Sequence, residues 1–403
     1  MAPEECAETP PKVVFIIGPT GVGKSRLGLD ICLELRKNGI NAEIVSADSM
    51  QVYKGCDIAT AKASAAEREA VPHHLLDVCT PQEAFTAADY LKAAKQTIQT
   101  LSDQGKLPVV VGGTQLYIQL LLWKSAVDIS AEQLHPHDRR RIIRSIEVTQ
   151  EFGVPHSEVM KGENSEKYDA CIFWLDLRDR EALEKRLRRR LEVMCEGGLL
   201  EEVRWVAAQL QLRSWPAAAG GAPEGPVDNL LSVSSPLSND SGDSEDPKDK
   251  IKKESFRGGV LQGIGYKEFF PVVLPKEEGV VSNGVSSGGL SCKELQEKEI
   301  KDCLNIALLR SLQYARQQRK WIRNKFLIRQ KNLPLYFFET NEAAVADWEK
   351  KICNPALQII KGFLAGEKFS EDSEFAAAKQ MPELLKLREE VSDNAAETNE
   401  SSG

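Results

Sequence analysis

Five short apolar segments recur along the chain, each six to eight residues long and separated by segments of helical length. They lie at 13–18, 42–48, 107–113, 171–177 and 333–340. Continuous apolar runs of this length are typical of strands buried on both faces, as in a parallel sheet with helices on either side. The pattern therefore predicts an α/β fold in which helices flank a parallel sheet.

Helical periodicity is clearest in two segments. The first begins at Arg180 and ends at the glycine pair 197–198, and its apolar repeat consists of Leu183, Leu187, Leu191 and Met194. The second runs from about 293 to 331. Its C-terminal half contains no acidic residue and carries Arg310, Arg316, Arg319, Lys320, Arg323, Lys325, Arg329 and Lys331. The first segment predicts an amphipathic helix, and the second predicts a helix with a basic surface.

The remaining long segments are polar. Residues 213–256 are rich in Pro, Gly, Ser and Asp, residues 276–291 are rich in Gly and Ser, and the chain after 367 is acidic. Such segments bury too little apolar surface to fold alone, so we predict two disordered insertions and a poorly ordered tail. No apolar run approaches the roughly 20 residues of a membrane span.

The formal net charge of -8 excludes a globally basic nucleic-acid binder, so any RNA-binding surface must be local. Nine cysteines are scattered without a CxxC pair, which is typical of a reducing compartment. We expect a cytoplasmic protein, with a mitochondrial or nuclear share left open, and a monomer without an obligate protein partner or membrane contact.

Residues 18–25 read GPTGVGKS and follow the first apolar segment directly. The matches to the P-loop pattern GxxxxGKS are Gly18, Gly23, Lys24 and Ser25. In such a loop, backbone N–H groups cradle phosphate, the lysine reaches the outer phosphate and the serine ligates Mg2+. The third apolar segment ends in Gly-Gly-Thr at 112–114 instead of the magnesium-holding Asp of kinases and ATPases, which disfavours hydrolysis.

Asp48 is the last residue of the second apolar segment, at the carboxyl end of the predicted strand. Doubly wound sheets bind their ligands at this edge, so Asp48 is expected to face the P-loop crevice. A carboxylate there can hold magnesium or accept a proton from a nucleophile that attacks near the phosphate. On position alone, a simple turn aspartate is an equally good interpretation.

Further motifs follow in order: ADSMQVYKGCDIATAK (47–62), VPHHLLD (71–77), FTAADY (85–90), VVGGTQLYI (110–118), HPHDRRRIIRSIEV (135–148), GGLLEEV (197–203) and GIGYKE (263–268). With the P-loop, this series resembles the tRNA isopentenyltransferases, also called tRNA dimethylallyltransferases. The resemblance covers roughly 12–330, and YARQQRKWIRNKF (314–326) is similar to the eukaryotic members. We find no zinc-finger pattern after this segment.

The resemblance implies a P-loop NTPase-like fold whose loop holds the diphosphate of dimethylallyl diphosphate. The allyl group passes to N6 of the adenosine 3′ of the tRNA anticodon, and the diphosphate leaves. Asp48 is implied as the general base. The implied diphosphate site comprises Gly18, Thr20, Gly21, Gly23, Lys24 and Ser25, with Mg2+ on Ser25, the hydroxyl of Thr114, and a basic clamp of Arg186 and Arg190.

For the tRNA anticodon loop, helical spacing places Arg316, Lys320 and Arg323 on one face of the basic helix, where phosphate contacts are expected. Gln51, three residues after Asp48, is a candidate for reading the adenine edge, with a surface glutamine as the competing interpretation. We assign a structural role to the histidine pair 73–74, because no other metal ligands accompany it.

The chain departs from the resembled family between 123 and 134, where most members carry several dozen additional, mostly helical residues and this chain has only KSAVDISAEQ (124–133). We predict a shortened helical insertion domain, with tRNA affinity as the property most affected. The predicted organisation is a P-loop core at 12–122, the tRNA-binding insertion at 123–168, core at 169–212, a disordered insertion at 213–256, core with the basic helix at 257–366, and the tail at 367–403. Ala59 replaces a usual glycine, which is tolerated unless the position needs a positive φ.

Three other functions stay open at this point. An adenylate isopentenyltransferase would prenylate free AMP, ADP or ATP, but such enzymes typically read SDKIQ around the base and lack the long basic helix. A P-loop small-molecule kinase would require the missing second Asp. A catalytically impaired tRNA-binding protein would explain the shortened insertion, although Asp48 and the P-loop are both retained.

Overall fold

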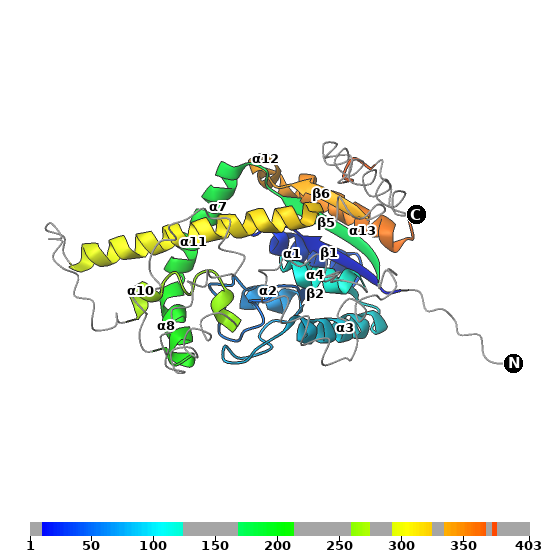
Figure 1. Cartoon of the computed structure of the whole chain (residues 1–403). Helices are drawn as coiled ribbons and strands as arrows, with labels where there is room; N and C mark the ends of the chain where they lie inside the picture. The colour runs from blue at the N-terminus through cyan, green and yellow to red at the C-terminus, as the bar shows by residue number, and fades with distance from the viewer. Residues whose placement is uncertain are drawn as a thin grey trace, which may run out of the picture.

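The computed structural model describes residues 10–123, 168–212, 259–274, 292–324, 334–367 and 373–376, with only the backbone for 292–296. Within these residues, one parallel sheet has the strand order β3-β2-β4-β1-β5-β6 (Figure 1). Its strands are β1 (Lys12–Ile17), β2 (Ala42–Ser46), β3 (His73–His74), β4 (Leu107–Gly112), β5 (Asp169–Asp176) and β6 (Leu335–Glu339). The predicted parallel sheet is confirmed, and all five predicted strands are present.

The apolar pattern missed β3, because this strand has only two residues and both are histidines. His73 Nδ1 lies 2.7 Å from the carbonyl oxygen of Val71, and His74 Nε2 lies 2.7 Å from a carboxylate oxygen of Glu43. Both rings are therefore engaged by the protein itself, in keeping with the structural role expected for this pair.

Helices connect and cover the strands. They are α1 (Lys24–Lys37), α2 (Ala65–Ala70), α3 (Ala87–Asp103), α4 (Gln115–Leu122), α7 (Arg180–Glu196), α8 (Leu199–Gln209), α10 (Phe270–Val273), α11 (Cys292–Ile322), α12 (Glu342–Ala346) and α13 (Asn354–Leu364). A 3-10 turn at Gly259–Gln262 and a π-helical turn at Glu349–Cys353 complete the described elements. In Figure 1, the C-terminal end of α11 reaches the sheet, and its N-terminal end extends away from it.

The sheet divides the core into two apolar layers. On β1, Val14 and Ile16 face one layer, and Phe15 and Ile17 face the other. The first layer is covered mainly by α1, α7, α8, α11 and α13, and the second mainly by α3 and α4. Because both faces are buried, the strands read as continuous apolar runs without alternation. Each large apolar side chain buried in this way contributes about 1.5–3 kcal/mol.

The helix predicted from Arg180 is confirmed as α7. Its N-cap is Asp179, whose carboxylate oxygen accepts the N–H groups of Glu181 and Ala182 at 2.9 and 3.2 Å. This side-chain cap replaces a partner that the first helical turn lacks. Gly198 then adopts a φ of 99° and starts α8, so the glycine pair does interrupt the helix as predicted.

The long basic helix is confirmed as α11 up to Ile322. Its predicted C-terminal part, 325–331, lies outside the described residues, as do 124–167 of the predicted insertion domain, the insertions 213–256 and 276–291, and most of the acidic tail. Four tail residues, 373–376, are described and lie against β6, where Phe337 N–H donates to the Phe375 carbonyl at 2.7 Å. Across the described residues, none of the helices combines the length and apolarity needed to cross a membrane.

Candidate active site

The P-loop joins β1 to α1 at the carboxyl edge of the sheet, in the strand–loop–helix context that the sequence predicts. Gly23 immediately precedes α1 with a φ of 95°, a left-handed conformation that glycine adopts without strain. The first turn of α1 has no side-chain cap, so its N–H groups and its dipole favour an anion in the loop.

Lys24 is the first residue of α1 and turns back over the loop. Its ammonium group donates to the carbonyl oxygen of Pro19 at 2.6 Å. Burial lowers the pKa of Lys24 to about 8, and Asp48 partly opposes this change. A cation with a single backbone partner and a depressed pKa is suited to gain an anionic ligand.

Asp48 lies two residues after β2, and main-chain hydrogen bonds hold its segment beside the end of β4. Ala47 N–H donates to the carbonyl of Val111 at 2.8 Å, and Ala47 in turn accepts from Thr114 N–H at 3.2 Å. The two segments lie so close that a Cβ on Gly112 would be 2.1 Å from the Ala47 carbonyl oxygen, so only glycine fits there. This close approach explains the glycine at 112, the last residue of β4.

The Asp48 carboxylate is only partly used by the protein. Its Oδ1 accepts the N–H of Met50 at 2.8 Å, and within the described residues Oδ2 has no hydrogen-bond partner. Asp48 is close enough to raise the pKa of Lys24 and of Arg190 against the effect of burial. The predicted base, the P-loop lysine and one predicted clamp residue therefore share one site.

Thr114 links the two strand ends next to this carboxylate. Its Oγ1 accepts the N–H of Ser49 at 2.9 Å and lies 3.3 Å from the Ser49 hydroxyl. Thr114 thereby fixes the residue that follows Asp48. The predicted hydroxyl is at the edge of the site, and its contacts in this structure are structural.

The two arginines of the predicted clamp point to different partners. Arg190 Nη1 donates to Thr20 Oγ1 in the P-loop at 3.1 Å, and burial lowers the pKa of Arg190. Arg186 instead donates to the hydroxyl and the carbonyl oxygen of Thr340, directly after β6. The structure thus brings Arg190 to the loop and holds Arg186 against the C-terminal part of the core.

Gln51 is engaged within the protein on both ends of its amide. Oε1 accepts from the Ser46 hydroxyl at 3.0 Å, and Nε2 lies 3.2 Å from the Thr60 carbonyl and 3.4 Å from that of Ala61. These bonds attach the loop after β2 to the strand itself. Reading of the adenine edge by Gln51 stays a prediction, and it requires these contacts to open.

The basic residues of α11 divide into two groups. Arg310 pairs with the buried Glu268, and Arg319 binds both oxygens of the buried Asp176 at 2.7 and 2.8 Å. The predicted RNA face consists of Arg316, Lys320 and Arg323. All three are exposed, and none has a partner within the described part of the chain.

Asp176 is a second carboxylate at the carboxyl edge of the sheet, and its contacts bear on whether the site could hydrolyse a nucleotide. It ends β5, beside β1, where a P-loop kinase or ATPase could place a magnesium-holding carboxylate. Both of its oxygens bind the Arg319 guanidinium, and Oδ1 also accepts the N–H of Leu177 at 2.8 Å. This carboxylate is therefore a structural partner of α11, and the geometry disfavours a hydrolytic role for it.

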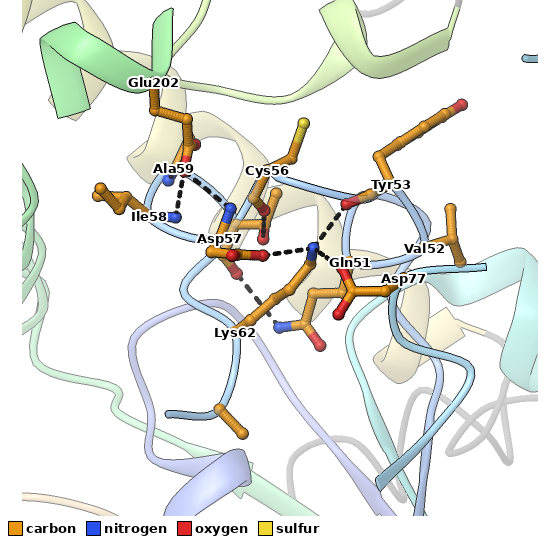
Figure 2. A network of polar contacts seen from close by, with 12 residues as sticks. Gln51, Val52, Tyr53, Cys56, Asp57, Ile58, Ala59, Lys62, Asp77 and Glu202 are labelled. Carbon is orange, nitrogen blue, oxygen red and sulfur yellow. Dashed lines mark hydrogen bonds and ion pairs between the residues drawn. The ribbon is translucent and has the colours of Figure 1, made fainter. Parts of the chain in front are cut away.

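The loop from 51 to 62 is held rigidly by a second set of charged residues, shown in Figure 2. The Glu202 carboxylate, from α8, accepts the N–H groups of Asp57, Ile58 and Ala59 at 2.8, 2.6 and 3.0 Å. It also accepts from the hydroxyl of Tyr266 at 3.0 Å. The motifs GGLLEEV and GIGYKE therefore meet at the DIATAK loop.

Lys62 fixes the other end of this loop (Figure 2). Its fully buried side chain donates to the Tyr53 carbonyl at 2.5 Å, to Asp57 at 2.7 Å and to Asp77 at 2.6 Å. Ala61 and Asp77 both have positive φ values, 48° and 55°, which non-glycine residues adopt only when their surroundings compel it. Ala59 has no positive φ, so the glycine usual in the family is not required there.

Together, the fold and the site define an α/β enzyme of the P-loop NTPase-like class, with a carboxylate beside its phosphate loop. The family model described as IPP transferase matches residues 51–130 and 124–223. The tRNA dimethylallyltransferase of Mus musculus is 31% identical over 405 residues, which cover 88% of this chain and 75% of that protein. The Bacillus subtilis (strain 168) protein of the same name is 36% identical over 226 residues, 48% of this chain and 70% of that protein.

Solved structures agree with these sequence matches. Crystal structures of a eukaryotic dimethylallyltransferase acting on tRNA match with a TM-score of 0.67 at 25% identity, covering 93% of this chain and 84% of that one. A tRNA delta(2)-isopentenylpyrophosphate transferase from Staphylococcus epidermidis shares the fold with a TM-score of 0.52 at 24% identity, covering 88% of this chain and 99% of that one. The chain belongs to the tRNA dimethylallyltransferase family of prenyltransferases.

Proposed function

We propose that this protein transfers the dimethylallyl group of dimethylallyl diphosphate to N6 of the adenosine 3′ of the anticodon in tRNA. One observation carries the proposal: Asp48, a carboxylate with one oxygen that has no partner within the described residues, shares a site with Lys24 of the P-loop and with Arg190 of α7. The names of the relatives, tRNA dimethylallyltransferase, support tRNA as the acceptor.

The chemistry requires a base, because the lone pair of the exocyclic amine is delocalised into the adenine ring. N6 forms a bond to C1 of the allyl group, the C1–O bond breaks, and the diphosphate leaves with the electron pair. Asp48 accepts the proton that N6 loses. Its Oδ2, which has no partner within the part of the chain that the structure describes, can take this proton without breaking the bond from Met50 N–H to Oδ1.

Departure of the diphosphate is favoured by the positive groups around the loop. The N-terminus of α1 and Lys24 face the developing charge, and Arg190 adds positive potential next to Thr20. Mg2+ fits the same site, because Ser25 is exposed and its hydroxyl has no partner within the described residues. A magnesium ion held by Ser25 and diphosphate oxygens would neutralise part of the leaving group's charge.

The exposed face of α11 supplies the RNA contact in this proposal. Arg316, Lys320 and Arg323 have no intramolecular anion within the described chain, so they are available for phosphates of the anticodon arm. The target adenine must then leave its stack to reach Asp48.

The test is to incubate the protein with Mg2+, radiolabelled dimethylallyl diphosphate and either unmodified tRNA or AMP. Label in tRNA, found as N6-isopentenyladenosine after digestion, is the expected result. Label in AMP alone would identify an adenylate isopentenyltransferase instead. Binding of tRNA and of diphosphate without label in either acceptor would refute transfer and identify an impaired binding protein.

A further inference from the structure

Gln318 lies on the face of α11 opposite the exposed basic residues, and it is only 2% exposed. Its side-chain amide is used at both ends. Oε1 accepts the N–H of Thr20 in the P-loop at 2.8 Å, and Nε2 donates to the carbonyl oxygen of Gly113 at 2.9 Å. One buried amide therefore joins two segments of the site that are far apart in the sequence.

Both partners of Gln318 lead directly to residues of the candidate active site. The Thr20 hydroxyl accepts from Arg190, so the amide and the arginine hold the same loop residue from two sides. Gly113 precedes Thr114, which binds the main chain next to Asp48. A Cβ at position 113 would lie 2.4 Å from Gln318 Nε2, so a side chain there would displace the amide from its present position.

Neighbouring side chains of α11 hold the adjacent strand end in the same way. Arg319 binds Asp176 and also donates to the carbonyl oxygen of Leu177 at 2.9 Å, at the end of β5. The C-terminal turns of α11 thus contact the P-loop and the ends of β4 and β5 together. The same turns present the basic face to the outside.

We propose that Gln318 is a positioning residue of the diphosphate site, which holds the P-loop at the distance from the Gly113–Thr114 turn that diphosphate binding requires. The identity of the ligand as a diphosphate rests on the proposed function. Gln318 acts through Thr20 and Gly113, and it does not contact the reacting atoms.

Removal of the amide leaves the Thr20 N–H without its partner and leaves the Gly113 carbonyl with only the long 3.5 Å bond from the Tyr314 hydroxyl. The P-loop N–H can recover a partner only if the loop moves. Gln318→Met keeps the length and approximate volume of the side chain but supplies neither bond. We expect the Kd for dimethylallyl diphosphate to rise about tenfold or more, in line with the loss of one to two buried hydrogen bonds.

The first measurement is calorimetric binding of dimethylallyl diphosphate and of inorganic pyrophosphate, with Mg2+ and without RNA. Gln317→Met is the matched control, because Gln317 is the neighbouring residue, is partly exposed and has no partner in the described part of the chain. The proposal expects weaker binding of both ligands by Gln318→Met only. Equal Kd values for the two variants would overturn it.

Gln318→Glu gives a sharper test, because its protonation changes the bond pattern. An ionised carboxylate accepts from Thr20 but repels the Gly113 carbonyl and the ligand, whereas a protonated carboxyl can donate to Gly113 as the native amide does. The ratio of its Kd to the wild-type Kd should therefore fall towards one between about pH 8 and about pH 5.5, as the buried carboxyl takes up a proton. A ratio that is independent of pH would overturn the role of the donor.

Thermal unfolding of each variant separates positioning from general stability. A Gln318→Met protein that melts earlier but binds pyrophosphate like the wild type, at a temperature where both are folded, would show a merely structural role and overturn the proposal. Because these measurements need no RNA and no transfer, they remain decisive even if the protein fails to modify tRNA. Failure of the proposed function and failure of this inference are therefore distinguishable.

Discussion

Two lysines in this molecule have opposite surroundings. Lys62 is fully buried and donates to three acceptors, the Tyr53 carbonyl and the carboxylates of Asp57 and Asp77. Within the described residues Lys24 has a single acceptor, the carbonyl of Pro19, and burial lowers its pKa to about 8. The first lysine belongs to a saturated network, and the second has donors to spare.

The carboxylates near these lysines show the same difference. Glu202 accepts three N–H groups and a hydroxyl, whereas Asp48 accepts one N–H and keeps an oxygen without a partner in the described chain. Groups that hold the fold are fully paired, and groups that await a ligand are not. The presence of a charged side chain is therefore not enough to identify a functional residue. The number of its satisfied hydrogen bonds separates groups that stabilise the fold from groups that can bind a ligand.

The largest expected effect comes from Asp48→Asn. The amide retains the size of the side chain but cannot accept the N6 proton, so prenyl transfer should fall by about two to four orders of magnitude. Single-turnover transfer of labelled dimethylallyl groups to tRNA measures this loss. The Kd for dimethylallyl diphosphate should stay within about twofold, since the P-loop is untouched. If the Asp48→Asn variant transferred the prenyl group at the wild-type rate, Asp48 would not be the general base.

The same substitution at the two lysines tests the comparison itself. Lys62→Met leaves Asp57, Asp77 and a buried carbonyl without their common partner, and Asp77 keeps only Arg68. We expect the free energy of unfolding to fall by about 2–3 kcal/mol, measured by urea denaturation. This estimate is below that for a wholly buried pair, because both carboxylates are partly exposed.

Lys24→Met is the matched control for that experiment. Burial disfavours the charged form of Lys24, so its removal should lower the free energy of unfolding by less than about 0.5 kcal/mol. Its cost should appear in diphosphate affinity instead, as a loss of about a hundredfold or more. Similar losses of stability in both variants would break the distinction between framework and ligand-binding lysines.

How far the sequence could predict these roles depends on the range of the contacts. The P-loop, Asp48 and the exposed face of α11 each follow from a contiguous pattern, because a strand, a turn and a helix fix their geometry locally. The carboxyl edge of a parallel sheet then brings the first two together. These features were predicted, and the structure places them as expected.

The remaining contacts join segments that only tertiary packing brings together. Nothing in the local sequence indicates that Glu202 caps the loop at 57–59 or that Gln318 bridges the P-loop and β4. The same limit explains why Arg186 does not contact the P-loop. It lies one helical turn from Arg190, but the position of β6 makes Thr340 its partner. The number of basic residues on α11 likewise did not indicate that Arg319 forms an ion pair with the buried Asp176.

A smaller effect, on tRNA affinity, is expected from substitutions on the exposed basic face of α11. Like Lys24 and Asp48, the residues of this face have hydrogen-bonding capacity that the described part of the chain does not use. The double variant Arg316→Ala and Lys320→Ala should weaken tRNA binding about tenfold at low salt and reduce the slope of log affinity against log salt by about 1.5–2. Filter binding over a salt series measures both values, and dimethylallyl diphosphate affinity should not change.

The control is the double variant Lys92→Ala and Lys95→Ala, which removes the same charge from exposed positions on α3. Its tRNA affinity and salt slope should remain close to those of the wild type. If both double variants lose affinity equally, the effect is one of net charge, and α11 carries no specific RNA face.

The smallest expected effect is the pH dependence of diphosphate binding through Lys24. The pKa of Lys24 is about 8 without ligand, and a bound diphosphate stabilises the charged form and raises it. Affinity is then constant below about pH 7 and falls as the free lysine loses its proton, by about fourfold between about pH 7 and about pH 8.5. Calorimetry in buffers of different ionisation enthalpy should detect proton uptake on binding near pH 8.

Lys24→Arg should abolish both the proton uptake and this pH dependence, because a guanidinium stays charged throughout the range. An unchanged pH profile in Lys24→Arg would assign the titration to another group. It would then be wrong that the burial of Lys24, by lowering its pKa, causes the pH dependence of binding.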